Sequence, residues 1–122
     1  MKNIYPMKLY KRIFKEILKS VSEEVEVAPE ELITSKTEDC FCARMAMCHC
    51  LSEHITDGEI SRLTGLSQQV VSRNKILYPQ RQRQSTTIRI ITRIINETID
   101  THITAYKQST NITQTEGSHP TT

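Results

Sequence analysis

The sequence predicts an all-helical, compact domain of about six helices. Two observations predict it: apolar residues recur at three- and four-residue spacing along most of the first 106 residues, and helix-capping residues precede these stretches. The chain has 122 residues, which is the size of one domain with a modest core. We therefore expect one domain over residues 1–106. Residues 107–122 are rich in Thr, Ser, Asn and Gln, so we expect a disordered tail there.

The first helix is expected over residues 6–25. Pro6 suits the first helical position, where its missing N–H would have no partner in any case. The apolar residues that follow are spaced as on one helical face: Met7, Tyr10, Ile13, Phe14, Ile17, Leu18, Val21 and Val25. A short second helix is expected over residues 28–32, because a proline and two glutamates suit its first turn. It should close over the core.

A third helix is expected over residues 37–54, with Thr37 as its cap. Its apolar residues form two stripes on different sides, so this helix should be the buried centre of the domain. Thiolate and imidazole ligands for zinc are present on it, namely Cys40, Cys42, Cys48, His49 and Cys50. On one helix, however, the four cysteines point in different directions around the axis. We therefore expect reduced, buried thiols and no metal site, with redox sensing as the alternative.

A pair of short helices is expected over residues 57–77. Thr56 and Glu59 match a capping box, in which each side chain accepts a hydrogen bond from the other residue's backbone N–H. Gly65 should end the first of the two helices, because glycine adopts the left-handed conformation of a tight turn. Ser61 is small where the two helices must cross. This arrangement is typical of a helix-turn-helix.

The second helix of this pair is expected over residues 67–77. Ser67 can cap its start. Pro79 disfavours continuation, so the helix should end just before Tyr78. The polar residues 80–84 are then a linker.

The last helix should begin at Ser85 or Thr86. Its isoleucines also favour a strand, and residues 88–90 alternate locally, so a β wing is the alternative. We favour a helix, because a wing needs a hairpin turn and neither Gly, Pro nor Asn-Gly occurs between Ser85 and Glu97. The broad apolar face of this helix carries Ile88, Ile91, Ile95, Ile99, Ile103 and Tyr106.

The outward side of the helix over residues 67–77 offers side chains that can read the edges of DNA bases. Glutamine can form two hydrogen bonds with adenine, and arginine can form two with guanine. The expected base-facing residues are Ser67, Gln68, Gln69, Ser72 and Arg73. The alternative is that the two helices are only a packing unit.

Positive charge is concentrated in the same part of the chain. Residues 60–96 contain no Asp or Glu, whereas acids dominate residues 23–59. A stretch of one sign is typical of a surface that faces a polyanion, although it can also be a solvent-exposed basic face. The expected contacts to the DNA backbone are Lys36, Arg44, Arg62, Lys75, Arg81, Arg83 and Arg89.

Two resemblances support this interpretation. Gly65, an aliphatic residue, Ser67 and residues 71–73 resemble the helix-turn-helix of the lac repressor family. Residues 10–106 resemble the C-terminal DNA-binding domain of the bacterial replication initiator DnaA. The segments that carry the second resemblance are Val25-Glu26-Val27, Glu31-Leu32, Ser35-Lys36, Ala43-Arg44-Met45-Ala46-Met47 and Glu59-Ile60.

The initiator resemblance implies a Trp-repressor-like helix-turn-helix fold and double-stranded DNA as the partner. The family's Asp-His-Thr-Thr-Val signature is replaced by residues 67–71, so the same target sequence is not expected. The sequence has no Gly-x-x-x-x-Gly-Lys-Ser/Thr phosphate loop, so the initiator's ATPase is not expected either.

We therefore expect a sequence-specific DNA-binding protein that regulates transcription or replication, with no enzyme activity and no cofactor. The alternative is a protein-interaction module that binds a second copy of the chain or another protein. It would use the basic face or the isoleucine helix, if Ile90 and Ile94 are exposed. No stretch of about 18 apolar residues occurs, and the basic residues of the first 19 are spread out, so neither a membrane span nor a secretory leader is expected. The expected location is cytoplasmic.

Overall fold

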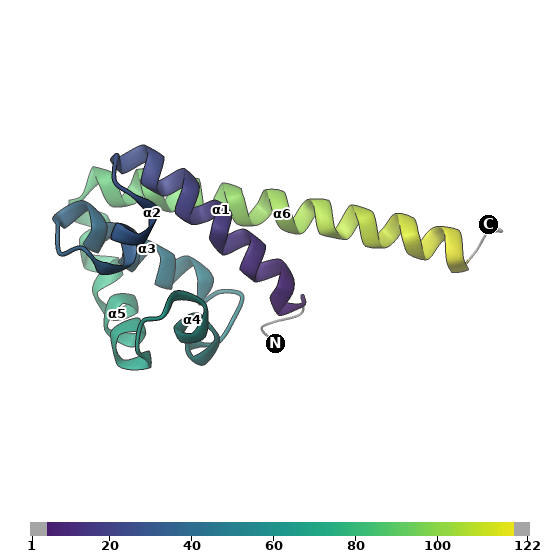
Figure 1. The fold of residues 1–122 in the computed structure, drawn as a ribbon, viewed down its shortest axis with the longest axis horizontal. Helices are drawn as coiled ribbons and strands as arrows, with labels where there is room; N and C mark the ends of the chain where they lie inside the picture. The colour runs from purple at the N-terminus through teal and green to yellow at the C-terminus, as the bar shows by residue number, and fades with distance from the viewer. Residues whose placement is uncertain (1–4, 119–122) are drawn as a thin grey trace.

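The computed structural model describes the backbone of residues 5–118 and the side chains of residues 5–110. This part of the chain is all-α, as predicted, with six helices and no strands. Helices α1 and α6 pack side by side, and α4 and α5 project from the opposite side of the central α3 (Figure 1). The bounds are α1 Met7–Val25, α2 Pro29–Thr34, α3 Glu38–Leu51, α4 Asp57–Thr64, α5 Gln68–Gln84 and α6 Thr86–Ser118.

Helix α3 is the centre of the core, as its two apolar stripes predicted. It packs against α6 on one side and α5 on the other. All four cysteines of α3 are buried, and so are Met45, Met47 and Leu51. Burial raises the pKa of Cys48 to about 11 and that of Cys50 to about 12. The predicted burial of the thiols is therefore confirmed, and these two are protonated near neutral pH.

Helices α1 and α2 close the core from one side. The apolar face of α1 places Ile13, Ile17 and Val21 at zero exposure. In α2, Leu32 is fully buried, and the Glu31 carboxylate accepts the backbone N–H of Ala28 at 3.0 Å. The short helix thus covers the core where the sequence predicted it.

The start of α4 and the turn between α4 and α5 have the local chemistry expected from the sequence. The Thr56 hydroxyl accepts the Glu59 N–H at 3.2 Å, and the Glu59 carboxylate accepts the Thr56 N–H at 2.9 Å. Gly65 ends α4 with φ of 84°, in the left-handed region that favours glycine. The Ser67 hydroxyl accepts the Val70 N–H at 3.2 Å and so caps α5. The predicted starts of both helices are confirmed.

Helix α5 is longer than predicted, because it continues through Pro79 to Gln84. Proline removes one helical hydrogen bond and crowds the preceding turn. Contacts with α6 offset this cost. The Tyr78 hydroxyl lies 2.9 Å from that of Thr92, and the Arg89 guanidinium donates to the carbonyls of Gln82 and Arg83 at 3.0 and 2.9 Å. The residues predicted as a linker are therefore the last turn of α5.

The isoleucine stretch is helical, as predicted, and no β wing is present within residues 5–118. The Ser85 hydroxyl accepts the Ile88 N–H at 3.2 Å and caps α6. Four isoleucines of α6 are buried in the core, namely Ile88, Ile91, Ile95 and Ile99. Ile90 and Ile94 are half-buried rather than exposed.

Helix α6 continues to Ser118, whereas the sequence predicted a disordered tail from residue 107. Neither Gly nor Pro occurs between Thr86 and Glu116, so no residue interrupts the helical hydrogen bonds there. The helix extends well beyond the rest of the molecule (Figure 1). Within the described side chains, the Tyr106 ring of α6 contacts the ring of Tyr5, which precedes α1, with centroids 5.7 Å apart. Residues 119–122 of the predicted tail lie outside the described residues.

Candidate nucleic-acid interface

The outward face of α5 carries the residues predicted to read bases. Ser67, Gln68, Gln69 and Arg73 are exposed, and Ser72 is half-buried. Together with Ile76, all of these except Ser67 line one shallow hollow on the surface of α5. The structure thus brings most of the predicted set together on one open surface.

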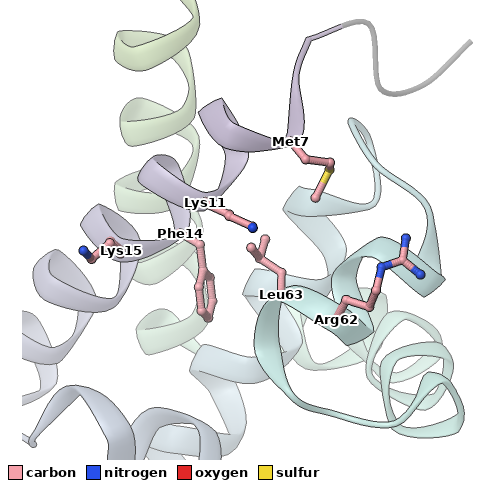
Figure 2. A pocket seen from close by; sticks show the side chains of 6 residues that line it. All are labelled: Met7, Lys11, Phe14, Lys15, Arg62 and Leu63. Carbon is pink, nitrogen blue, oxygen red and sulfur yellow. The ribbon is translucent and has the colours of Figure 1, made fainter.

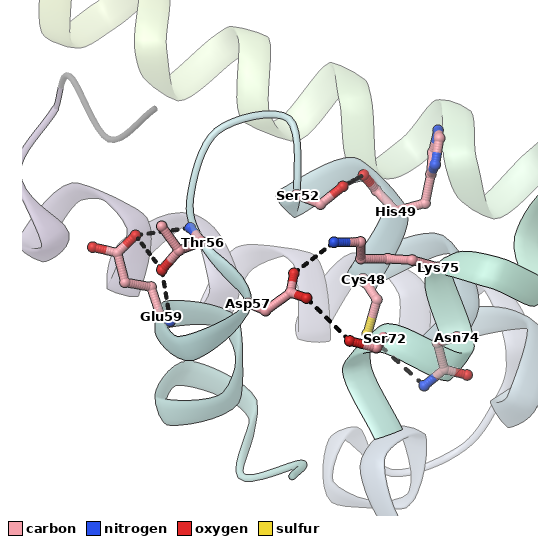
Figure 3. A network of polar contacts seen from close by, with 9 residues as sticks. All are labelled: Cys48, His49, Ser52, Thr56, Asp57, Glu59, Ser72, Asn74 and Lys75. Atoms are coloured by element: carbon pink, nitrogen blue, oxygen red, sulfur yellow. Dashed lines mark hydrogen bonds and ion pairs between the residues drawn. The ribbon is translucent and has the colours of Figure 1, made fainter. Parts of the chain in front are cut away.

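The first residue of α4 fixes the middle of α5. The two oxygens of the Asp57 carboxylate accept hydrogen bonds from the Lys75 ammonium at 2.6 Å and from the Ser72 hydroxyl at 3.2 Å (Figure 3). In the turn, the Ser61 hydroxyl donates to the Leu66 carbonyl at 2.6 Å. These contacts set how α5 lies against α4.

Lys75 was predicted to contact the DNA backbone and Ser72 to face the bases, but both side chains contact Asp57 instead. Lys75 forms an ion pair with Asp57, and its side chain is 31% exposed, so it is already neutralised within the molecule. The Ser72 hydroxyl is turned toward α4 rather than outward. Both side chains therefore position α5. The sequence could not predict this pairing, because 18 residues separate Asp57 from Lys75.

The inward face of α5 is anchored on α3. Val71 is fully buried, and the Asn74 amide lies 3.9 Å from the Cys48 sulfur. The Tyr78 ring stacks on His49, with centroids 3.9 Å apart and planes within 6°. Asn74 is buried on this inward face, where its amide faces the Cys48 sulfur. The anchoring leaves the opposite face of α5 outward.

Arg44 is a second correction. It is only 6% exposed, its guanidinium donates to the Leu32 carbonyl at 2.7 Å, and it lies over the Phe41 ring at 4.8 Å. Burial lowers the pKa of this guanidinium. Arg44 therefore ties α2 to α3 and is not placed to contact a DNA backbone.

Two other predicted backbone contacts are engaged within the molecule. Arg81 forms an ion pair with Glu38 of α3, although its side chain remains 39% exposed. Arg89 is exposed but uses its guanidinium to cap the end of α5. A phosphate would have to compete with these contacts.

Four predicted cations remain open. Lys36, Arg62, Arg73 and Arg83 are exposed, and none has a hydrogen bond or ion pair with another described residue. Arg62 lies close to the start of α5, since a Cβ placed on Gly58 would be 3.9 Å from its guanidinium and 3.6 Å from the Gln68 amide. Arg62 therefore lies near Gln68 on the open face of α5.

The structure adds two cations that the sequence analysis missed. Lys11 and Lys15 of α1 line a cavity of about 500 Å³ with Arg62, over an apolar floor of Met7, Phe14 and Leu63. Figure 2 shows Lys11 reaching from α1 toward Leu63 of α4, next to the Phe14 ring. The signal was present, because Lys8, Lys11, Arg12 and Lys15 follow helical spacing on the exposed face of α1. These residues lie outside the acid-free stretch that defined the predicted interface.

A groove of about 390 Å³ borders the other side of α5. It lies between α5 and the start of α3, and its lining includes the apolar Ile33, Phe41 and Leu77 as well as Lys36. Arg73 lines this groove as well as the hollow on α5. Lys36, predicted from the loop before α3, therefore lines the same groove as Arg73.

The chain matches no protein-family model, no curated protein and no solved structure. Among the described residues, no three His, Cys, Asp or Glu side chains gather closely enough to hold one metal ion. Within the same part of the chain, no helix has both the length and the apolar content that crossing a bilayer demands.

Proposed function

We propose that this protein binds double-stranded DNA in a sequence-specific manner, with the outward face of α5 in the major groove. One observation carries the proposal: α5 is anchored on its inner side and exposes Gln68, Gln69 and Arg73 on the other. These side chains can form paired hydrogen bonds with adenine and guanine, which are distinguishable in the major groove. A helix with this division of faces is how helix-turn-helix proteins read sequence.

Phosphate contacts supply the rest of the interface. Lys36, Arg62 and Arg83 are open cations, and Lys11 and Lys15 extend the basic surface from α4 onto α1. Such contacts orient a protein on the duplex without reading its sequence. They also make affinity depend on salt, because each phosphate neutralised releases counterions.

The finer architecture that we propose is that of the Trp-repressor-like domain of the replication initiator. It is supported by the order of the elements, in which a long helix and a short one precede a buried helix, a tight helical pair and a closing isoleucine helix. The proposed role is regulation of transcription or replication, by binding alone and without catalysis.

Selection from a random duplex library, followed by fluorescence anisotropy on the enriched sequence, tests the proposal. We expect enrichment of one sequence, binding that weakens steeply between about 50 and 200 mM salt, and loss of preference in Arg73→Ala. Retention of full affinity and preference by Arg73→Ala would remove α5 as the reading helix. Absence of binding to any duplex at low salt would favour the interaction module instead.

The alternative function, a protein-interaction module, would use a different surface from the isoleucine helix that the sequence suggested. Ile90 and Ile94 are half-buried, so they offer little open apolar surface on α6. The exposed large hydrophobic residues among the described ones are Phe41, Ile76 and Leu77. Light scattering coupled to size-exclusion chromatography would report self-association through them.

A further inference from the structure

Ile76 is the most exposed large hydrophobic side chain of the described residues, at 77%. A single exposed aliphatic residue is ordinary on a protein surface. The position of Ile76 is not ordinary, because it lies on α5 beside the side chains that we propose read bases. Any partner that covers this face of α5 would therefore contact Ile76 as well.

Ile76 belongs to one stripe of α5. Gln69, Ser72, Arg73 and Ile76 are spaced i, i+3, i+4 and i+7, which places them on one side of a helix. The hollow on α5 is lined by these four residues and Gln68. Asp57 holds the Ser72 hydroxyl toward α4. The groups that the stripe offers outward are thus an amide, a guanidinium and the branched aliphatic chain of Ile76.

In the major groove, thymine is the one standard base that presents an apolar group, its C5-methyl. An aliphatic side chain gains by covering that methyl and gains nothing from the polar edges of the other bases. Arg73 and Ile76 are three residues apart, about 4.5 Å along the helix axis, whereas successive base pairs are about 3.4 Å apart. A helix that places Arg73 on one base pair therefore places Ile76 one or two pairs away.

We propose that Ile76 is a specificity residue that recognises the methyl group of a thymine, one or two base pairs from the pair that Arg73 contacts. This inference rests on the proposed DNA-binding function. It makes the target of the protein a sequence with a thymine at a fixed distance from the guanine expected for Arg73. Leu77, the adjacent exposed residue, lines the groove on the other side of α5 and is not part of this stripe.

Replacement of thymine by deoxyuridine removes only the methyl group and provides the test. In the selected duplex, each thymine is replaced singly, and affinity is measured for the wild type, Ile76→Ala and Leu77→Ala. We expect one replacement to weaken wild-type binding about fourfold, the ratio that burial of one methyl group gives. Ile76→Ala should bind the unmodified duplex about as weakly and show no further loss with deoxyuridine. Leu77→Ala should respond as the wild type does.

The outcomes separate the two proposals. Specific binding that is indifferent to deoxyuridine at every position, or an Ile76→Ala variant that keeps the wild-type penalty, would overturn the role of Ile76 alone. A selected sequence without thymine near the Arg73-dependent position would do the same. Failure to bind any duplex would overturn the DNA-binding proposal and this inference with it. Because Ile76 is exposed, its replacement should leave folding intact, which circular dichroism would verify.

Discussion

Helices α3 and α5 pack against each other, yet they differ in how much of each is buried. In α3, ten of the 14 residues are buried, including the charged Arg44, whereas in α5 only Val71, Asn74 and Tyr78 of its 17 residues are buried. Apart from the exposed Phe41, the apolar side chains of α3 are buried, whereas Ile76 and Leu77 of α5 are exposed. Helix α3 therefore holds the fold together, whereas α5 is held by a few buried residues and leaves most of its surface exposed.

Truncation in α3 should produce the largest effect. Leu51 has no exposure, so Leu51→Ala should lower the free energy of unfolding by about 2 to 5 kcal/mol through lost burial and a cavity. Urea denaturation monitored by circular dichroism would measure it. Gln69→Ala in α5 is the matched surface control and should change stability by less than about 0.5 kcal/mol. Equal losses of stability in the two variants would contradict the conclusion that α3 contributes more to stability than the exposed face of α5.

The thiols of α3 should make stability fall in alkaline solution. An unfolded chain loses thiol protons near the ordinary pKa of 9.0, whereas folded Cys48 and Cys50 keep theirs to about pH 11 and 12. Folding is therefore favoured below pH 9 and progressively less so above it. By pH 10 we expect a loss of roughly 1 kcal/mol for each thiol, measured by urea denaturation at pH 8 and pH 10. Cys50→Ala should flatten the dependence, and a flat wild-type profile would contradict the prediction.

Replacement of Arg73 tests the other half of the comparison, namely that exposed residues of α5 affect binding and not stability. Arg73→Ala should weaken binding to the selected duplex by about 1 to 3 kcal/mol and relax preference at one base pair. Its unfolding free energy should stay within about 0.5 kcal/mol of the wild type, because the side chain is exposed. Lys107→Ala, on the part of α6 that extends away from α5, is the matched charge control and should bind as the wild type does.

The smallest expected effect is on the salt dependence of binding, which should differ between an exposed, unpaired cation and one that is paired within the protein. Arg83→Ala should reduce the slope of log affinity against log salt by about 1 and weaken all sequences alike. Lys75→Ala should leave that slope unchanged, because Asp57 already neutralises Lys75. Anisotropy titrations at several salt concentrations would measure both slopes. A reduced slope in Lys75→Ala would restore Lys75 as a phosphate contact.

Local signals allowed much of the fold to be predicted from the sequence. The capping box of Thr56 and Glu59, the glycine at Gly65 and the cap at Ser67 act within a few residues of themselves, so their chemistry can be interpreted without knowledge of the fold. The spacing of apolar residues likewise indicated which faces of α1 and α3 are buried. The exposed face of α5 followed from the same reasoning.

Two errors share a different cause, namely contacts between different helices. Pro79 does not end α5, because Arg89 and Thr92 of α6 stabilise the turns around it. Arg44 is buried because Leu32 offers a carbonyl to its guanidinium. The sequence shows that a residue is positively charged, but not whether the folded protein buries or pairs it. Partner geometry decides which cations remain available.

The Asp57 carboxylate also fixes α5 before any ligand is bound. By holding Ser72 and Lys75 from the first residue of α4, it sets the crossing of the two helices when the chain folds. A ligand that meets α5 then encounters a preorganised surface and need not offset the entropy of ordering that helix during association.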